Sequence, residues 1–175
     1  MIHLIALDEP ELERLLRDPD GGLREMISNG PEVKAFLLPV LAQTRDFYQR
    51  VGCTTPWHGY LAVESEGSLL VGICAFKGKP NEGGEVEIAY GTVPGFESRG
   101  YATRAAKALV EIAFRSSAVR RVIAHTLPEP NASTRVLRKA GLDFVGEVID
   151  PEDGRVWRWA VARDRMQPES KFGSA

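Results

Sequence analysis

Residues 85–116, EVEIAYGTVPGFESRGYATRAAKALVEIAFRS, decide the fold of this chain. Over Glu85–Val93 the residue types alternate with period two, which predicts a strand that carries Glu85 and Glu87 on one face. From residue 101 to 116 apolar residues recur at helical spacing, which predicts an amphipathic helix. A glycine-containing loop, residues 94–100, joins the two. The segment therefore reads as a strand, a loop and a helix in direct succession.

The loop and the start of this helix form a candidate site for an anion. The first N–H groups of a helix lack intrahelical partners, and Gly100 lets a ligand approach the backbone without a Cβ in the way. Arg99 and Arg104 flank the helix start, where cations are normally unfavourable and a bound phosphate would reverse that preference. The alternative is that both arginines are simply solvated. Neither a Walker A sequence nor G-x-G-x-x-G is present, so the loop does not predict a nucleoside triphosphate or a dinucleotide.

Two motifs carry a resemblance to a known family. The run Glu97-Ser98-Arg99-Gly100-Tyr101-Ala102 resembles the acetyl-coenzyme A loop of the GNAT N-acetyltransferases, Gln/Arg-x-x-Gly-x-Gly/Ala, and Arg-Gly-Tyr-Ala-Thr is most like the ribosomal-protein N-acetyltransferase branch. Glu97 departs from that pattern, and we expect this carboxylate to turn outward from a pyrophosphate. Residues 125–141 resemble the second signature of the family, with Ser133 on its serine position and Asn131 one place after its asparagine position.

The resemblance implies a fold and a cofactor. The implied fold is α/β (α+β), with a mixed, mostly antiparallel seven-stranded sheet flanked by helices. The implied co-substrate is acetyl-coenzyme A, with no metal, and a bulge at Gly91 is expected to free backbone amides, with the Val93 N–H polarising the thioester carbonyl. The residues expected to hold the co-substrate are Gly91, Thr92, Val93, Arg99, Gly100, Tyr101, Ala102, Thr103, Asn131 and Ser133.

The implied reaction is acetyl transfer to a primary amine, by direct attack in a ternary complex. An amine is protonated at neutral pH, so a base must remove a proton before the nitrogen attacks. Glu87 is the first candidate base and Glu85 the alternative, against the interpretation that both are surface acids. His125 is a further candidate base, although a structural histidine is the favoured interpretation.

The candidate acid is less clearly marked. Many family members have a tyrosine four residues before the glycine of the second signature, where this chain has Leu137. Ser133 or a water held by Asn131 is then the substitute, or the thiolate leaves unassisted.

Aromatic residues suggest a pocket for the acceptor. The candidates for this pocket are Trp57, His58, Tyr60 and Glu85, together with Phe47 and Tyr48, although aromatics at such positions are equally typical of a core. Trp157 and Trp159 share a face of the last strand, as packing or as a wall of the pocket.

The rest of the chain supplies alternating strands and helices. Residues 18–22 predict a turn, and a short helix is expected around residues 23–27, closed near Gly30-Pro31. The expected strands are 2–7, 60–63, 69–76, 85–93, 120–126, 142–149 and 156–161, and the expected helices are 9–17, 33–51 with an interruption or a kink at Pro39, 101–116 and 132–140.

Composition limits the remaining possibilities. The 175 residues are 43% hydrophobic and 26% charged, which predicts one domain over residues 1–165 with a disordered tail at 166–175. The net charge of −2 does not favour a nucleic-acid partner, and no apolar run reaches 18 residues, so we expect no membrane partner and a cytoplasmic location. The acceptor is a small amine or a protein N-terminus, and the chain a monomer or homodimer. The alternative function is a catalytically inactive acyl-coenzyme A sensor or interaction module.

Overall fold

The structure is a computed structural model of the whole chain, and it describes residues 1–24, 31–66 and 68–166. The expected tail apart from Met166, which ends a 3₁₀ turn, and most of the short helix expected around residues 23–27 lie outside the described residues. The elements run in the order β1 (Ile2–Leu7), α1 (Glu9–Arg17), α2 (Pro19–Arg24), α3 (Pro31–Val51), β2 (Gly59–Glu64), β3 (Leu70–Phe76), β4 (Glu85–Thr92), α4 (Tyr101–Arg115), β5 (Arg121–Thr126), α5 (Ala132–Lys139), β6 (Asp143–Asp150), β7 (Gly154–Ala162) and the 3₁₀ turn η1 (Arg163–Met166).

One seven-stranded sheet forms the centre of the molecule. Its strand order is β1-β2-β3-β4-β5-β7-β6, with antiparallel neighbours everywhere except the parallel pair β4–β5. The crossover helix α4 joins the two strands of that parallel pair, whereas the antiparallel pairs β2–β3, β3–β4 and β6–β7 are joined by short connections without a helix. The expected mixed, mostly antiparallel sheet flanked by helices is confirmed.

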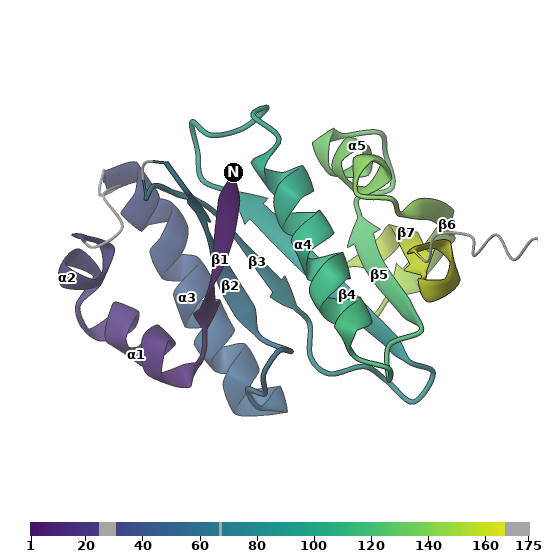
Figure 1. Cartoon of the computed structure of the whole chain (residues 1–175), viewed down its shortest axis with the longest axis horizontal. Coiled ribbons are helices and arrows are strands. Elements are labelled where there is room, and N and C mark those ends of the chain that lie inside the picture. The colour runs from purple at the N-terminus through teal and green to yellow at the C-terminus, as the bar shows by residue number, and fades with distance from the viewer. Residues whose placement is uncertain (25–30, 67, 167–175) are drawn as a thin grey trace, which may run out of the picture.

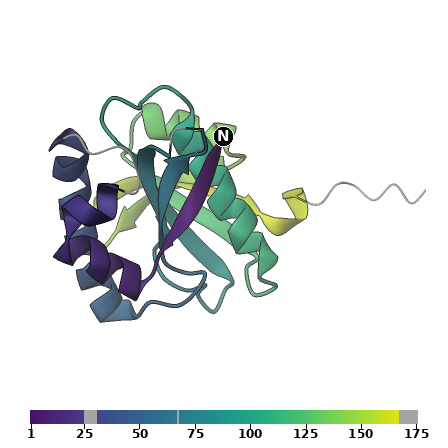
Figure 2. The same cartoon turned by 60° about the vertical axis from the view of Figure 1, so that its left-hand side comes forward.

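Helices cover both faces of the sheet (Figures 1 and 2). The apolar stripe of α4 and Leu137 of α5 pack on one face, over Val86 and Ile88 of β4. Leucines of α1 and α3 pack on the other face, over Leu61 and Ile73. Since side chains alternate along β4, Glu85 and Glu87 lie on the α3 side of the sheet, opposite to α4. No helix among the described residues is long and apolar enough to span a membrane.

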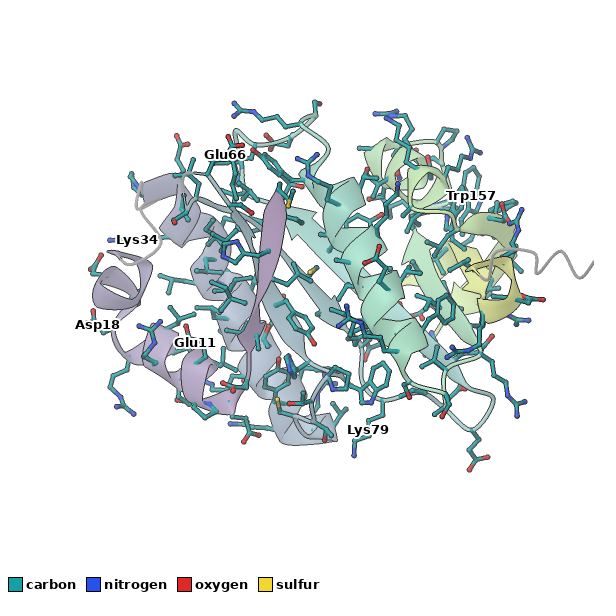
Figure 3. The ribbon with its side chains drawn as sticks, in the orientation of Figure 1. Glu11, Asp18, Lys34, Glu66, Lys79 and Trp157 are labelled. Atoms are coloured by element: carbon teal, nitrogen blue, oxygen red, sulfur yellow. The ribbon has the colours of Figure 1, made fainter. Side chains whose placement is uncertain are left out.

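Two expected features are wrong at the residue level. Residues 19–24 form helix α2 rather than a turn, because Pro19 fits the first turn of a helix and the Asp18 carboxylate accepts the Gly21 N–H at 2.9 Å. Lys34 of α3 pairs with Asp20 of α2, at the end of the molecule remote from Trp157 (Figure 3). Helix α3 also runs through Pro39 as one helix, so of the expected interruption or kink the interruption is wrong.

Candidate active site

Strands β4 and β5 separate toward their carboxyl ends (Figure 1). Their register pairs only Glu85–Glu87 with Arg121–Ile123, although β4 continues to Thr92 and β5 to Thr126. The unpaired ends leave a gap in the middle of the sheet. Such a gap exposes backbone groups and side chains from both strands to one ligand.

The backbone amides of β4 face this gap at every second residue. The carbonyl of Glu87 accepts from Lys77 and the N–H of Val93 donates to Val71 at 3.0 Å, so odd-numbered residues of β4 bond to β3. By alternation, the backbone groups of Tyr90 and Thr92 face β5 and the gap. The pairing with β3 runs without a shift, so the expected bulge at Gly91 is wrong. The Val93 amide is already bonded, and the free amides of β4 belong to even-numbered residues.

A cavity of about 360 Å³ occupies the gap and is called here the β4–β5 cavity. Its polar lining consists mainly of Lys77, Glu87, Tyr90, His125, Ser133 and Asp153. These residues come from β4, β5, the loop that follows β3, the start of α5 and the β6–β7 turn. The cavity therefore gathers titratable groups that are far apart in the sequence.

Glu87 contacts two partners at this cavity, the Lys77 ammonium and the His125 imidazole. Its Oε1 lies 3.0 Å from the Lys77 Nζ and 3.1 Å from the His125 Nδ1, and its side chain is only 19% exposed. The Nε2 atom of His125 is buried and has no hydrogen-bond partner within the described part of the chain. With Nδ1–H donating to Glu87, the Nε2 lone pair remains available to a ligand.

Tyr90 lies at the same gap, next to the start of α5. Its hydroxyl donates to the backbone carbonyl of Ser133 at 3.3 Å. Burial raises the pKa of Tyr90 to about 12, although the hydrogen bond to Ser133 acts in the opposite direction. The phenol is therefore protonated throughout the neutral range. Leu137, by contrast, is fully buried in the core under α5.

The start of α4 presents unused amides. Its first intrahelical bond runs from the Arg104 N–H to the Gly100 carbonyl at 3.1 Å, and no partner within the described residues occupies the N–H groups of Tyr101, Ala102 and Thr103. Gly100 has φ 78° and Ser98 has φ 61°, so two left-handed residues bend the loop ahead of the helix. Left-handed residues in such a loop turn successive backbone N–H groups toward one side, and this arrangement suits a bound anion.

Side chains of the loop have definite partners. The Arg99 guanidinium lies over Phe96 and that of Arg104 over Tyr101, with ring-centre distances of 5.3 and 4.8 Å. The Tyr101 hydroxyl donates to Glu64, so only the backbone of Tyr101 is available at the loop. The Glu97 carboxylate accepts the Gly95 N–H at 2.7 Å. Glu97 thus closes its own loop rather than opposing the helix start.

Helix α5 faces the start of α4 across a second cavity, of about 310 Å³, called here the α4–α5 cavity. Ala102 and Thr103 line one side, and Arg135 and Lys139 line the other. Asn131 caps α5, since its Oδ1 accepts the Thr134 N–H at 3.0 Å while the Thr134 hydroxyl accepts from the Asn131 N–H. The cap stabilises α5 and occupies the side-chain oxygen of Asn131.

Of the residues expected to form the acceptor pocket, Trp57, His58 and Tyr60 lie together, and Glu85 lies apart from them. Trp57 and Tyr60 pack against Phe76 in the core on the α4 side. His58 is 1% exposed and its Nδ1 lies 2.7 Å from the Gly59 carbonyl. Glu85 lies on the other face, between two arginines. The aromatic cluster is therefore packing rather than a pocket, because its edge-to-face contacts fill the space.

Glu85 is the centre of an ion-pair network. Its two oxygens accept from Arg121 at 3.0 Å and from Arg158 at 2.8 Å. Burial alone would raise the pKa of Glu85, but the hydrogen bonds from Arg158 and Arg121 hold it below its usual value. This carboxylate is therefore committed to β5 and β7 and is not free as a base.

Sequence reasoning did not find Tyr90, Lys77, Arg135 or Lys139. In the sequence, Tyr90 continues the alternating apolar pattern of its strand, and nothing there indicates that its hydroxyl reaches α5. The two basic residues did leave a signal, since Arg135 and Lys139 are four apart and so share one face of α5. Which face meets α4 is decided only by the tertiary structure.

Comparisons with known proteins agree with this fold. The family description "Acetyltransferase (GNAT) domain" matches residues 10–143. The uncharacterized N-acetyltransferase YjdG of Bacillus subtilis (strain 168) is 23% identical over 142 residues, which cover 80% of this chain and 84% of that protein. Among solved structures, AAC(6')-Ib with ribostamycin and coenzyme A has a TM-score of 0.66, 19% identity and 99% coverage of both chains. RimL, a ribosomal L7/L12 alpha-N-protein acetyltransferase with coenzyme A, has a TM-score of 0.61 and 17% identity, covering 92% of this chain and 93% of that chain.

Proposed function

The chain belongs to the acetyltransferase (GNAT) family, and we propose that it transfers an acetyl group from acetyl-coenzyme A to a primary amine within a ternary complex. One observation carries the proposal. The gap between β4 and β5 lies between free N–H groups at the start of α4 and the paired side chains of Glu87 and His125. The N–H groups at the start of α4 can hold the phosphates of a thioester, and its acyl group can then reach the Glu87–His125 pair.

The residues present fit the phosphate end of acetyl-coenzyme A. The free amides of Tyr101, Ala102 and Thr103 are donors for the pyrophosphate, with Arg99 beside them. Arg135 and Lys139 face the same cavity and add positive charge there. The Glu97 carboxylate is bonded within its own loop, which removes the repulsion that its position in the motif suggests.

The pantetheine arm fits the gap itself. The amides of Tyr90 and Thr92 face the gap and replace the expected donors Gly91 and Val93. We assign the polarisation of the thioester carbonyl to one of these two amides, since the Val93 N–H is bonded to β3. The capping role of Asn131 leaves only its side-chain nitrogen for the arm.

His125 is the proposed base, and Glu87 is its positioning residue. The Oε1 of Glu87 already accepts from Lys77 and His125, whereas the Nε2 of His125 has no partner among the described residues. An imidazole oriented by a carboxylate through Nδ1 accepts a proton at Nε2 and stabilises the resulting charge against that carboxylate. This assignment replaces Glu87 as the group that takes the amine proton directly.

Tyr90 is the proposed acid. Its phenol is protonated in the neutral range and lines the same cavity as His125. As the amine nitrogen bonds to the acetyl carbon, the carbon–sulfur bond breaks and Tyr90 gives its proton to the departing thiolate. Tyr90 then has the acid role that was expected of Ser133, and that a tyrosine has in many family members at the position of Leu137. His125 passes the first proton, taken from the ammonium group, to solvent. It then takes the second nitrogen proton as the amide forms, and that proton restores Tyr90 through solvent. The balanced products are the acetylated amine, free coenzyme A and one proton.

The test is release of free thiol from acetyl-coenzyme A with a panel of primary amines, measured beside the calorimetric affinity for coenzyme A. Amine-dependent release with micromolar or millimolar binding supports acetyl transfer. Binding without release from any amine favours an acyl-coenzyme A sensor. Absence of binding contradicts both functions.

A further inference from the structure

A third cavity, of about 240 Å³, lies between α3 and the centre of the sheet, and is called here the α3 cavity. Phe36, Val40 and Thr44 of α3 line one wall. They are spaced four residues apart, so they form one stripe of that helix. Ile73, Ala89 and Gly91 line the opposite wall. The two small residues on β4 leave the space open, since a Cβ at position 91 would lie 3.5 Å from the Phe36 ring.

The lining of the α3 cavity is almost wholly apolar. Among the described residues, no charged side chain lines it. Its two hydroxyl-bearing residues both donate to backbone carbonyls, Thr44 to Val40 at 2.7 Å and Tyr90 to Ser133 at 3.3 Å. A cationic or anionic group placed there would lose its hydration without gaining a partner. The volume is also smaller than that of most pockets for drug-sized ligands, which begin at about 300 Å³. It suits one small apolar group.

The α3 cavity adjoins the proposed reaction site. Ala89 and Tyr90 line both this cavity and the β4–β5 cavity. Glu87, Ala89 and Gly91 follow one another on the same face of β4, and residues two apart on a strand are about 6.6 Å apart. An amine beside the Glu87–His125 pair therefore places its nearest substituent over Ala89, against α3.

The charges around the reaction site do not provide a place for a second cationic group. Glu87 is paired with Lys77 and His125, and Glu85 with Arg121 and Arg158. The remaining acid at the β4–β5 cavity, Asp153, is exposed. Burial would lower the pKa of Lys77, but the hydrogen bond and charge of Glu87, with a smaller effect of Asp153, raise it. A polyamine would meet the Lys77 ammonium, the two paired carboxylates, and one exposed acid, Asp153, whose charge already acts on Lys77.

We infer that the acceptor carries a single amine next to an apolar aliphatic or aryl group, and that the α3 cavity binds this group. The inference rests on the proposed function and specifies its acceptor. Two sources offer this chemistry, a small monoamine and a peptide whose first residue is apolar. Both share the amine and the apolar substituent that the cavity fits.

Matched acceptors test the inference on the full-length protein. Pentylamine and 1,4-diaminobutane have nearly the same length and differ in whether the far end is a methyl or an ammonium group. Tripeptides Leu-Gly-Gly, Lys-Gly-Gly and Asp-Gly-Gly make the same comparison for peptides. We expect kcat/KM to favour the apolar member by about tenfold or more within at least one series. Preference for pentylamine alone identifies a small monoamine, and preference for Leu-Gly-Gly identifies a peptide.

A matched pair of variants links the preference to the cavity. Thr44→Glu places a carboxylate at the α3 cavity, and Gln43→Glu makes the same charge change at the next, exposed position of α3. Thr44→Glu should lower kcat/KM for the apolar acceptor by about tenfold and reduce the ratio of kcat/KM between apolar and charged acceptors. Gln43→Glu should leave this kcat/KM and this ratio unchanged. If Thr44→Glu fails to fold, Phe36→Ala enlarges the cavity instead and should shift the preference toward bulkier apolar groups.

The outcomes separate the inference from the proposed function. Efficient acetylation of diaminobutane or Lys-Gly-Gly, with no advantage for apolar acceptors, overturns the inference and leaves acetyl transfer intact. An apolar preference that neither Thr44→Glu nor Phe36→Ala alters also overturns it. Binding of coenzyme A with no thiol release from any acceptor overturns acetyl transfer and the acceptor assignment together.

Discussion

The Nδ1 of His125 lies 3.1 Å from the Oε1 of Glu87, across the point where β4 and β5 cease to pair. The two residues are 38 positions apart, on either side of α4. Their contact fixes the imidazole with Nε2 buried and without a partner in the described chain. A buried nitrogen without a partner is costly, and substrate binding at the gap would relieve that cost.

Replacing His125 by Gln should lower kcat by about 100-fold and leave the affinity for coenzyme A nearly unchanged, because the proposed base acts only on the amine. Glu87→Gln should lower kcat less. The double variant should be no slower than His125→Gln alone, because the two side chains act as one unit. Single-turnover rates together with calorimetry measure these effects, and multiplicative losses would separate the two roles.

Replacing Tyr90 by Phe should lower kcat by about 100-fold if its hydroxyl protonates the thiolate. The lost hydrogen bond to Ser133 accounts for only about 1 kcal/mol of unfolding free energy. Chemical denaturation checks the stability and thiol release checks the rate. Ser133→Ala is the control, since the backbone carbonyl that Tyr90 contacts remains, and a larger loss there would return the acid role to the serine.

Alanine at Gly100 should weaken binding of acetyl-coenzyme A. The residue has φ 78°, and a Cβ there would lie 3.3 Å from the Arg104 guanidinium, beside the free amides. Gly52→Ala is the matched control, because Gly52 has φ 80° with no atom near its Cβ position and lies after α3. Both variants should lose about 1 kcal/mol of unfolding free energy. Only Gly100→Ala should raise the KM for acetyl-coenzyme A, and equal KM values would place the phosphates elsewhere.

Charge reversal at Lys139 should raise the Kd for coenzyme A by about tenfold and reduce its dependence on salt, because the α4–α5 cavity loses a cation. Lys107→Glu makes the same change on the exposed side of α4, away from that cavity. Calorimetry at two salt concentrations compares the variants. Similar affinities would remove Lys139 from the phosphate site.

Glu85→Gln tests the ion-pair network as a source of stability. The pKa of Glu85 is lowered in the folded state, so its contribution is present above about pH 4.3, the usual value for glutamate, and disappears as the pH falls through the lowered value. At pH 7 the variant should lose about 1 kcal/mol of unfolding free energy, and the difference should vanish in acid. Denaturant titrations over this pH range measure it. A difference that persists in acid would mean that the arginines do not stabilise the carboxylate.

The elements near the proposed site were predictable because their patterns are local. The alternation along β4 and the apolar stripe of α4 place Glu87 and the loop before Tyr101 without reference to the rest of the chain. The Asp18–Gly22 run was misread as a turn, because the same residue types cap a helix as well as break one. The aromatic run at Trp57 was equally ambiguous, since nothing local separates a packed ring from a pocket wall.

The sequence by itself determined the strand–loop–helix segment, its candidate phosphate loop and the family resemblance, because these depend on residues that are neighbours along the chain. Only the tertiary structure decided which groups meet at the gap. The contact of His125 with Glu87 and that of Tyr90 with Ser133 join residues 38 and 43 positions apart. Such contacts depend on how two strands and a crossover helix pack together, and the periodicity of the local sequence does not predict that arrangement.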